Sequence, residues 1–142
     1  MAPSNPWNSY RRVATQTATP GQLILQLYDG AVRFLEAALA GFAHDDPVEF
    51  NATINSNVQR AQEIIRELSI SLNVEAGGEF AWTLRRLYDY FDRRLMESNM
   101  RKDQEGIREV IQSITVLRDA WATMLQRGSG APSDEPMSRV AA

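Results

Sequence analysis

The chain has 142 residues, a length that suits one compact domain with a buried core. Its 15 basic and 18 acidic residues give a net charge of −3, so the composition does not indicate a nucleic acid or an anionic membrane as a partner. Because there is no cysteine, disulfides, thiolate zinc sites, iron–sulfur clusters and cysteine nucleophiles are all excluded.

Targeting signals are not evident in the sequence. The first residues lack the basic and apolar regions of a secretory signal peptide. No window approaches the roughly 18 consecutive apolar residues that a membrane-spanning helix needs. We therefore expect a cytoplasmic protein without membrane insertion.

The first 18 residues are expected to form an N-terminal arm with a short helix. Tyr10, Val13 and Ala14 would lie on one side of a helix over residues 8–15. A helix of this length is marginally stable in water unless it docks on something larger. We therefore interpret residues 1–18 as a detachable arm.

The first long helix is predicted over residues 20–42. Thr19 is a favoured N-cap, Pro20 suits the first helical position, and Gln22 completes a capping-box pattern. Apolar side chains then follow the spacing of one buried helix face. They are Leu23, Ile24, Leu27, Tyr28, Ala31, Phe34, Leu35, Ala38 and Phe42.

Three more amphipathic helices are predicted after the first, over residues 47–72, 78–99 and 103–127. Asp46 and Asp103 are the expected N-caps of the second and last of the four helices. The pair Gly77-Gly78 marks a turn before the third. No alternation of apolar and polar residues is long enough to indicate a strand.

These segments predict an all-α fold, an antiparallel up-and-down four-helix bundle over residues 19–127. Beyond the bundle, residues 128–142 are rich in Gly, Pro and Ser and cannot bury enough apolar surface to fold. We expect a disordered C-terminal tail.

The first helix carries more apolar surface than one buried stripe needs. Leu25, Val32 and Leu39 recur every seven residues on the flank beside that stripe. In the third helix, Trp82 and Tyr90 also lie outside the main stripe. Two interpretations stay open: the flanks broaden the core or are covered by the arm, or they form a groove for a helical partner. Both hold if the arm covers the groove while the partner is absent.

Catalytic and metal-binding patterns are missing. His44, the single histidine, lies in a turn and cannot supply the paired ligands of a di-iron bundle. Neither a glycine-rich phosphate loop nor a G-x-S-x-G motif occurs. Asn51, Asn55 and Gln59 form a polar row that is either ordinary surface or a set of donors for the backbone of a partner. We expect no enzymatic activity, no cofactor and no metal.

Several segments occur in a specific order and at specific spacings. They are Tyr10, Thr17-Ala18-Thr19-Pro20, Leu27-Tyr28-Asp29-Gly30-Ala31, Arg60-Ala61-Gln62-Glu63-Ile64-Ile65, Leu87-Tyr88-Asp89-Tyr90 and Leu117-Arg118-Asp119-Ala120-Trp121. This set resembles the flagellin export chaperones of the FliS family, over about residues 10–125.

The resemblance implies a cytoplasmic export chaperone. Such a protein would bind the disordered C-terminal segment of flagellin in a hydrophobic groove, prevent its premature polymerisation and deliver it to the flagellar type III export apparatus. The resemblance also implies that the arm can cover this groove. The alternative is a homodimeric helical scaffold or regulatory protein without a flagellin client, and the same flank would also allow a weak homodimer. The candidate partner-binding residues are Tyr10, Leu25, Tyr28, Val32, Leu39, Asn55, Trp82 and Tyr90.

Overall fold

A computed structural model describes residues 19–128 of the chain. This part contains four α-helices and no β-strand, which confirms the all-α fold class. The helices are α2 (Pro20–Gly41), α3 (Pro47–Ile70), α4 (Val74–Arg101) and α5 (Gln104–Gly128). The expected N-terminal arm and C-terminal tail fall almost entirely on residues outside the described range, although the first residue assigned to the tail, Gly128, still belongs to α5.

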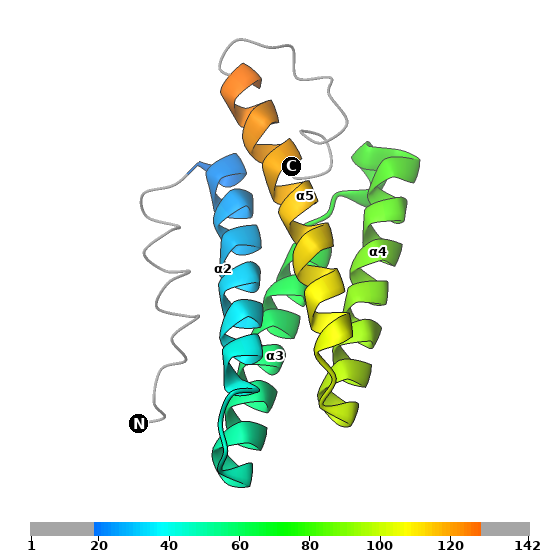
Figure 1. Ribbon diagram of the computed structural model, residues 1–142. Helices are drawn as coiled ribbons and strands as arrows, with labels where there is room; N and C mark the ends of the chain where they lie inside the picture. The colour runs from blue at the N-terminus through cyan, green and yellow to red at the C-terminus, as the bar shows by residue number, and fades with distance from the viewer. Residues whose placement is uncertain (1–18, 129–142) are drawn as a thin grey trace, which may run out of the picture.

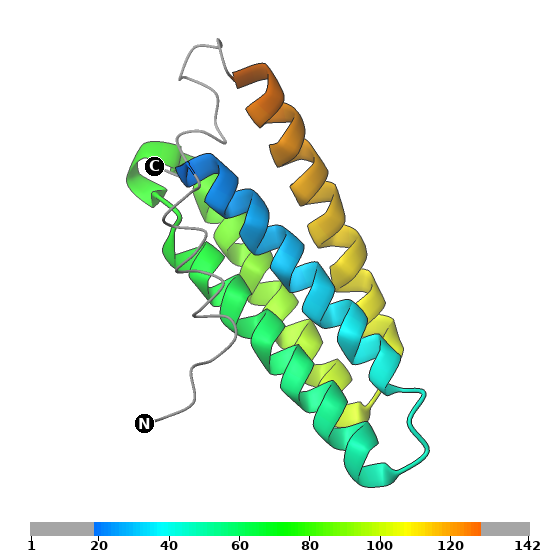
Figure 2. The same ribbon diagram turned by 90° about the vertical axis from the view of Figure 1, so that its left-hand side faces the viewer.

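The four helices pack side by side into one bundle, and each connection lies at one of its two ends (Figures 1 and 2). Both α2 and α4 pack against α3 and against α5. The bundle therefore has four principal seams, meaning the lines along which two neighbouring helices meet: α2–α3, α3–α4, α4–α5 and α2–α5.

Three of the four helices, α2, α3 and α5, begin where local signals predict. At the start of α2, Thr19 Oγ1 accepts a hydrogen bond from the backbone N–H of Gln22 at 3.2 Å, and Gln22 Oε1 accepts one from the N–H of Thr19 at 3.1 Å. This is the predicted capping box. The Asp46 carboxylate caps α3, and the Asp103 carboxylate accepts a backbone N–H at the start of α5. These contacts lie at the positions where the sequence places the N-caps of α2, α3 and α5.

The junction between α3 and α4 differs from the prediction. The third helix was expected to begin at residue 78, but α4 begins at Val74, because the Asn73 side chain accepts a backbone N–H of its first turn at 3.1 Å. Gly78 then interrupts the helical geometry, with φ 58° and ψ −137°, a conformation that favours glycine. The Gly77-Gly78 break is therefore a kink inside α4.

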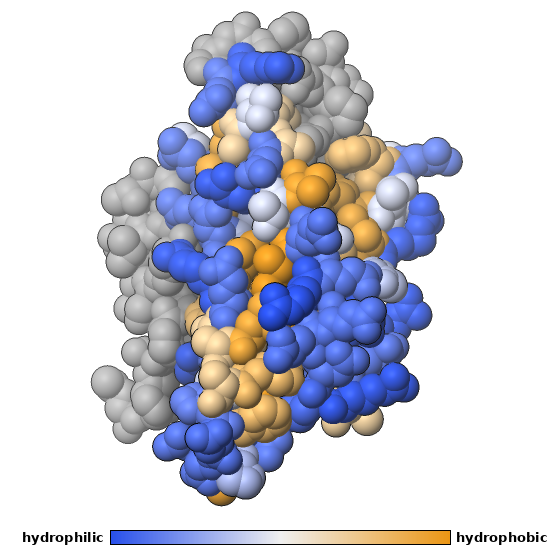
Figure 3. All heavy atoms as spheres, in the orientation of Figure 1, coloured by the Kyte–Doolittle hydropathy of each residue, from blue (hydrophilic) through white to orange (hydrophobic). Residues whose placement is uncertain are grey.

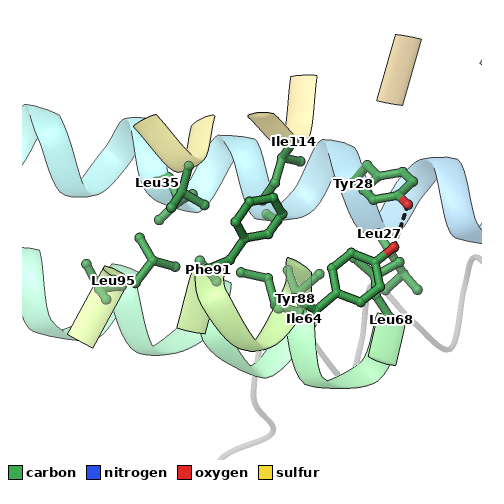
Figure 4. Close-up of a cluster of buried hydrophobic side chains, with 14 of the residues drawn as sticks. Leu27, Tyr28, Leu35, Ile64, Leu68, Tyr88, Phe91, Leu95 and Ile114 are labelled. Atoms are coloured by element: carbon green, nitrogen blue, oxygen red, sulfur yellow. Dashed lines mark hydrogen bonds between the residues drawn. The ribbon is translucent and has the colours of Figure 1, made fainter. Parts of the chain in front are cut away.

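The core is built from the predicted apolar stripes. Figure 4 shows part of it, with side chains from all four helices pointing toward one another. Leu35 of α2, Ile64 of α3, Phe91 of α4 and Ile114 of α5 are all at most 1% exposed. Packing of this kind is the main source of stability in a helical bundle.

Two tyrosines join helices on opposite sides of the bundle. The hydroxyl oxygens of Tyr28 on α2 and Tyr88 on α4 are 2.6 Å apart and share a hydrogen bond (Figure 4). Burial raises the pKa of both hydroxyls above the ordinary value of 10.0. Both groups therefore stay protonated at neutral pH, and the bond holds α2 against α4 through the core.

Candidate partner-binding groove

Three of the predicted site residues share one face of α2. Leu25, Val32 and Leu39 are partly buried and pack against the core from its edge. Val32 lines a hollow shared with α5. Because seven residues make nearly two helical turns, Leu25 and Leu39 lie on the same side of α2 as Val32. The predicted flank is therefore the side of α2 that faces α5.

The hollow between α2 and α5 has a volume of about 430 Å³. Its uncharged lining consists of Val32 from α2 and Thr115 from α5, both partly buried. The Thr115 hydroxyl already donates to the carbonyl of Ile111 within α5 at 2.7 Å. The rest of the lining is charged: Asp29, Arg33, Glu36, Arg118 and Asp119. We call the surface formed by Leu25, Val32 and Leu39 of α2 with Thr115 and Arg118 of α5 the α2–α5 groove.

The groove is closed at the start of α2. There, Trp121 Nε1 of α5 donates a hydrogen bond to the carbonyl of Gly21 at 2.7 Å. A Cβ atom on Gly21 would lie only 2.6 Å from Leu125 Cδ2, so the two helices touch at this level. The hollow lies further along α2, in the direction of its C-terminus.

An ion pair crosses the groove between α5 and α2. Arg118 Nε lies 2.6 Å from Asp29 Oδ1, and Arg118 Nη1 lies 3.0 Å from Asp119 Oδ1. The hydrogen bond to Asp29, followed by the one to Asp119, raises the pKa of Arg118. The guanidinium is therefore a permanent positive charge held over the groove by two carboxylates.

The surface over α2 and α5 is apolar in places and charged in others. Figure 3 shows apolar side chains in a broken band along the face where these helices lie, with hydrophilic atoms between the apolar parts. A partner on this face would therefore meet apolar contacts at intervals and would have to accommodate charges between them.

Tyr28 does not belong to the groove, which corrects its place among the candidate residues. It is 2% exposed, and its ring lies in the core with its hydroxyl bonded to Tyr88. On a helix, Tyr28 is three residues beyond Leu25 and therefore about 60° away around the axis. That rotation is enough to move a side chain from the groove into the core.

Asn55 and Tyr90 lie on two other seams. Asn55 Oδ1 on α3 accepts a hydrogen bond from Asn99 Nδ2 on α4 at 2.8 Å. The Tyr90 hydroxyl on α4 donates to the Glu109 carboxylate on α5. Both side chains therefore join neighbouring helices outside the α2–α5 groove.

Trp82 and Tyr10 complete the set of candidates. Trp82 on α4 is 48% exposed, and the Arg85 guanidinium carbon lies 5.6 Å from the centroid of its ring. Tyr10 lies outside the described residues. Among the seven candidates within the described residues, the structure brings together Leu25, Val32 and Leu39 on one face of α2 and places the other four elsewhere.

Comparison with known proteins decides the family. The sequence profile described as "Flagellar protein FliS" matches residues 3–128. The chain belongs to the FliS family. The flagellar secretion chaperone FliS of Bacillus subtilis is 36% identical over 126 residues, covering 89% of this chain and 90% of the relative. The FliS of Salmonella typhimurium is 34% identical over 116 residues, covering 82% and 84%.

A further relative is the flagellar secretion chaperone FliSB of Pseudomonas aeruginosa, 32% identical over 104 residues, which cover 73% of this chain and 79% of the relative. Membership of the FliS family makes the protein a chaperone of flagellar export and not an enzyme. Within residues 19–128, no group of three or more His, Cys, Asp or Glu side chains could hold a metal ion. None of the helices in that range is long and apolar enough to cross a membrane.

The sequence did not predict that α5 forms one side of the groove in this FliS-family chain. Asp29 and Arg118 both occur in segments that carry the family resemblance, but their pairing joins residues 89 positions apart. A single sequence does not say which two helices become neighbours, so this contact has no local signal. The only available hint was that Asp29 lies one helical turn from both Leu25 and Val32.

Proposed function

We propose that this protein binds the disordered C-terminal segment of flagellin along the α2–α5 groove in the cytoplasm. Binding would prevent premature polymerisation until the segment is delivered to the flagellar type III export apparatus. The observation that carries the proposal is the hollow beside Val32, in line with Leu25 and Leu39 on the same face of α2. Partly exposed apolar surface in a groove between helices suits an amphipathic helical partner.

The geometry supports a reversible complex. A disordered segment loses conformational entropy when it is ordered on a surface, which lowers its affinity for a given buried area. The seven-residue steps of the groove match the repeat with which an amphipathic helix presents its apolar side chains. A chaperone that must release its client at export benefits from this combination of good fit and limited affinity.

The arm is a second part of the proposal. We take residues 1–18, with Tyr10, to compete with flagellin for the groove. We also take the bundle to be antiparallel, as its short connections favour. Support comes from the start of α2 at Pro20, where Gly21 contacts α5 at the closed end of the groove. A segment tethered there has a high effective concentration near the groove.

Deletion of residues 1–15 should raise the binding of an apolar dye or the tendency to dimerise, and no change in either would argue against a covering arm.

Calorimetry with a flagellin C-terminal peptide tests the groove directly. The variant Val32→Asp places a carboxylate where the client must exclude water, and we expect the affinity to fall about tenfold or more. Val116→Asp is the matched control, because Val116 lies on α5, is 64% exposed and does not line the hollow. It should bind like the wild type. A folded Val32→Asp variant with undiminished affinity would overturn the assignment of the groove.

Measuring the mass in solution separates this proposal from a homodimeric scaffold. An export chaperone should form a complex with the flagellin peptide and lose any dimer that uses the same groove. A scaffold would remain dimeric and ignore the peptide. The two functions therefore predict opposite responses to one added component.

A further inference from the structure

The Asp29–Arg118 ion pair lies between Leu25 and Val32, two of the apolar residues of the α2–α5 groove. Asp29 follows Leu25 by four residues and precedes Val32 by three, so it lies about one helical turn from each. Arg118 reaches it from the opposite wall, with its Nε atom 2.6 Å from the carboxylate. The apolar surface on the Leu25 side is thereby separated from that on the Val32 side by a charged contact.

The charges around this contact restrict what can lie against it. The lining of the hollow contains three carboxylates and two guanidinium groups, a net charge of −1: Asp29, Glu36 and Asp119 against Arg33 and Arg118. A carboxylate of the partner would meet this negative excess. An apolar side chain would remove water from the ion pair without replacing its hydrogen bonds, which is unfavourable.

A neutral polar side chain avoids both penalties. The ion pair is about two-fifths exposed on each side, 38% for Arg118 and 39% for Asp29, so its outer surface is still hydrated. A hydroxyl or amide from the partner can take the place of that water and hydrogen-bond to either charge. One polar position inside an otherwise apolar helical interface is a known way to set the register of the helices.

We propose that the Asp29–Arg118 ion pair is a specificity determinant of the groove, an inference that rests on the proposed function. It selects a client helix with a neutral polar residue facing the ion pair and apolar residues one turn before and after it. A helix docked in another register places an apolar or acidic side chain over the charges and binds more weakly.

The test is a double-mutant cycle across the interface. Each polar residue on the groove-facing side of a flagellin C-terminal peptide is changed singly to Leu, and the peptides are titrated against the wild type and against Arg118→Met. Methionine keeps an unbranched side chain but removes the charge. At one peptide position, Leu should weaken binding to the wild type about threefold or more, and this loss should disappear with Arg118→Met.

Two further variants keep the test decisive. Asp29→Asn removes the ion pair from the α2 side of the groove with little change in shape. It should abolish the same loss of affinity at the same peptide position, so the result does not depend on how well Arg118→Met folds. Arg94→Met is the matched control, because Arg94 forms an interhelical ion pair with Glu109 on another seam, with Nε 2.9 Å from the carboxylate. It should leave the ranking of the peptides unchanged.

The possible failures are distinguishable. If the native peptide binds, depends on Val32, and shows the same ranking with and without Arg118 and Asp29, the ion pair is no specificity determinant, while the proposed function stands. If the native peptide does not bind the wild type at all, the proposed function fails and this inference fails with it.

Discussion

Helix α5 makes two seams that are packed in opposite ways. Against α4, it brings Gly106 so close that a Cβ atom there would lie 2.0 Å from Ser98 Oγ and 3.1 Å from the Arg94 carbonyl oxygen. Against α2, a hollow of about 430 Å³ remains beside Val32 and Thr115. The same helix is thus tightly packed on one side and leaves space on the other, so the groove is a local feature and not a sign of loose packing throughout the bundle.

Each of these seams also has an arginine–carboxylate pair, but the surroundings differ. On the α4–α5 seam, Glu109 accepts hydrogen bonds from both Arg94 and Tyr90, so one carboxylate serves two donors. On the α2–α5 seam, the single guanidinium of Arg118 serves two carboxylates beside the hollow. The first arrangement closes a seam, whereas the second borders a surface that a partner can reach.

The largest expected effect comes from adding one methyl group to the tight seam. Gly106→Ala should destabilise the protein by about 1–3 kcal/mol, because the new Cβ has no room beside Ser98 and the Arg94 backbone. Without such crowding, replacing glycine by alanine inside a helix is stabilising. Urea unfolding measures the difference, with Gly128→Ala as the control, since no described atom lies within 4 Å of a Cβ placed on Gly128, on the same helix.

A companion variant tests the cause of that effect. Ser98 Oγ is buried and has no hydrogen-bond partner among the described residues, so Ser98→Ala should cost little by itself. Combined with Gly106→Ala, it should recover part of the lost stability. If Gly106→Ala is as stable as the wild type, the proposed contrast between the two seams is wrong.

A smaller effect is expected from filling the hollow. Thr115→Ile adds apolar volume to the α2–α5 seam and should change the free energy of unfolding by less than about 1 kcal/mol, since the space is open. The same variant should lower the affinity for a flagellin peptide several-fold, because the added group occupies the place proposed for the client. Urea unfolding and calorimetry on one sample check both parts. A large loss of stability would show that the hollow has no usable space.

The smallest effect concerns the pH dependence of the tight seam. The hydrogen bond from Tyr90, followed by the one from Arg94, lowers the pKa of Glu109 below its ordinary value of 4.5. A carboxyl group with a lower pKa in the folded state stabilises the fold above its unfolded pKa, and this contribution is lost as the pH falls through the folded value. The stability advantage of the wild type over Glu109→Gln should therefore be constant near neutral pH and shrink below pH 4.5. Urea midpoints at pH 7 and pH 3 measure it, and an advantage that grows on acidification would contradict the assigned cause.

The sequence predicted most reliably those features that depend on neighbours along the chain. The capping box of Thr19 and Gln22 needs only four consecutive residues, and the seven-residue recurrence of Leu25, Val32 and Leu39 identifies one face of one helix. Gly78 shows the limit of such signals, since it marks a break but does not say that helix precedes it.

The rest of the site depends on contacts between distant helices. Tyr90 was grouped with the groove because it lies outside the apolar stripe of its helix, but its hydroxyl bonds to Glu109 on a different seam. Asp29 was not among the predicted site residues, because the role of its carboxylate comes from its hydrogen bond with Arg118. Both outcomes follow from the arrangement of the helices in space, which the periodicity of one helix does not encode.

The contact between Trp121 and Gly21 has a consequence for the order of folding. It joins residues 100 positions apart, so forming it closes a loop that contains nearly the whole bundle. Closing a longer loop costs more chain entropy than joining two successive helices. The three seams between successive helices join segments that are close in sequence, whereas the seam between α2 and α5 joins the two ends of the bundle. We therefore expect the α2–α5 seam, which borders the groove proposed for the client, to form late in folding.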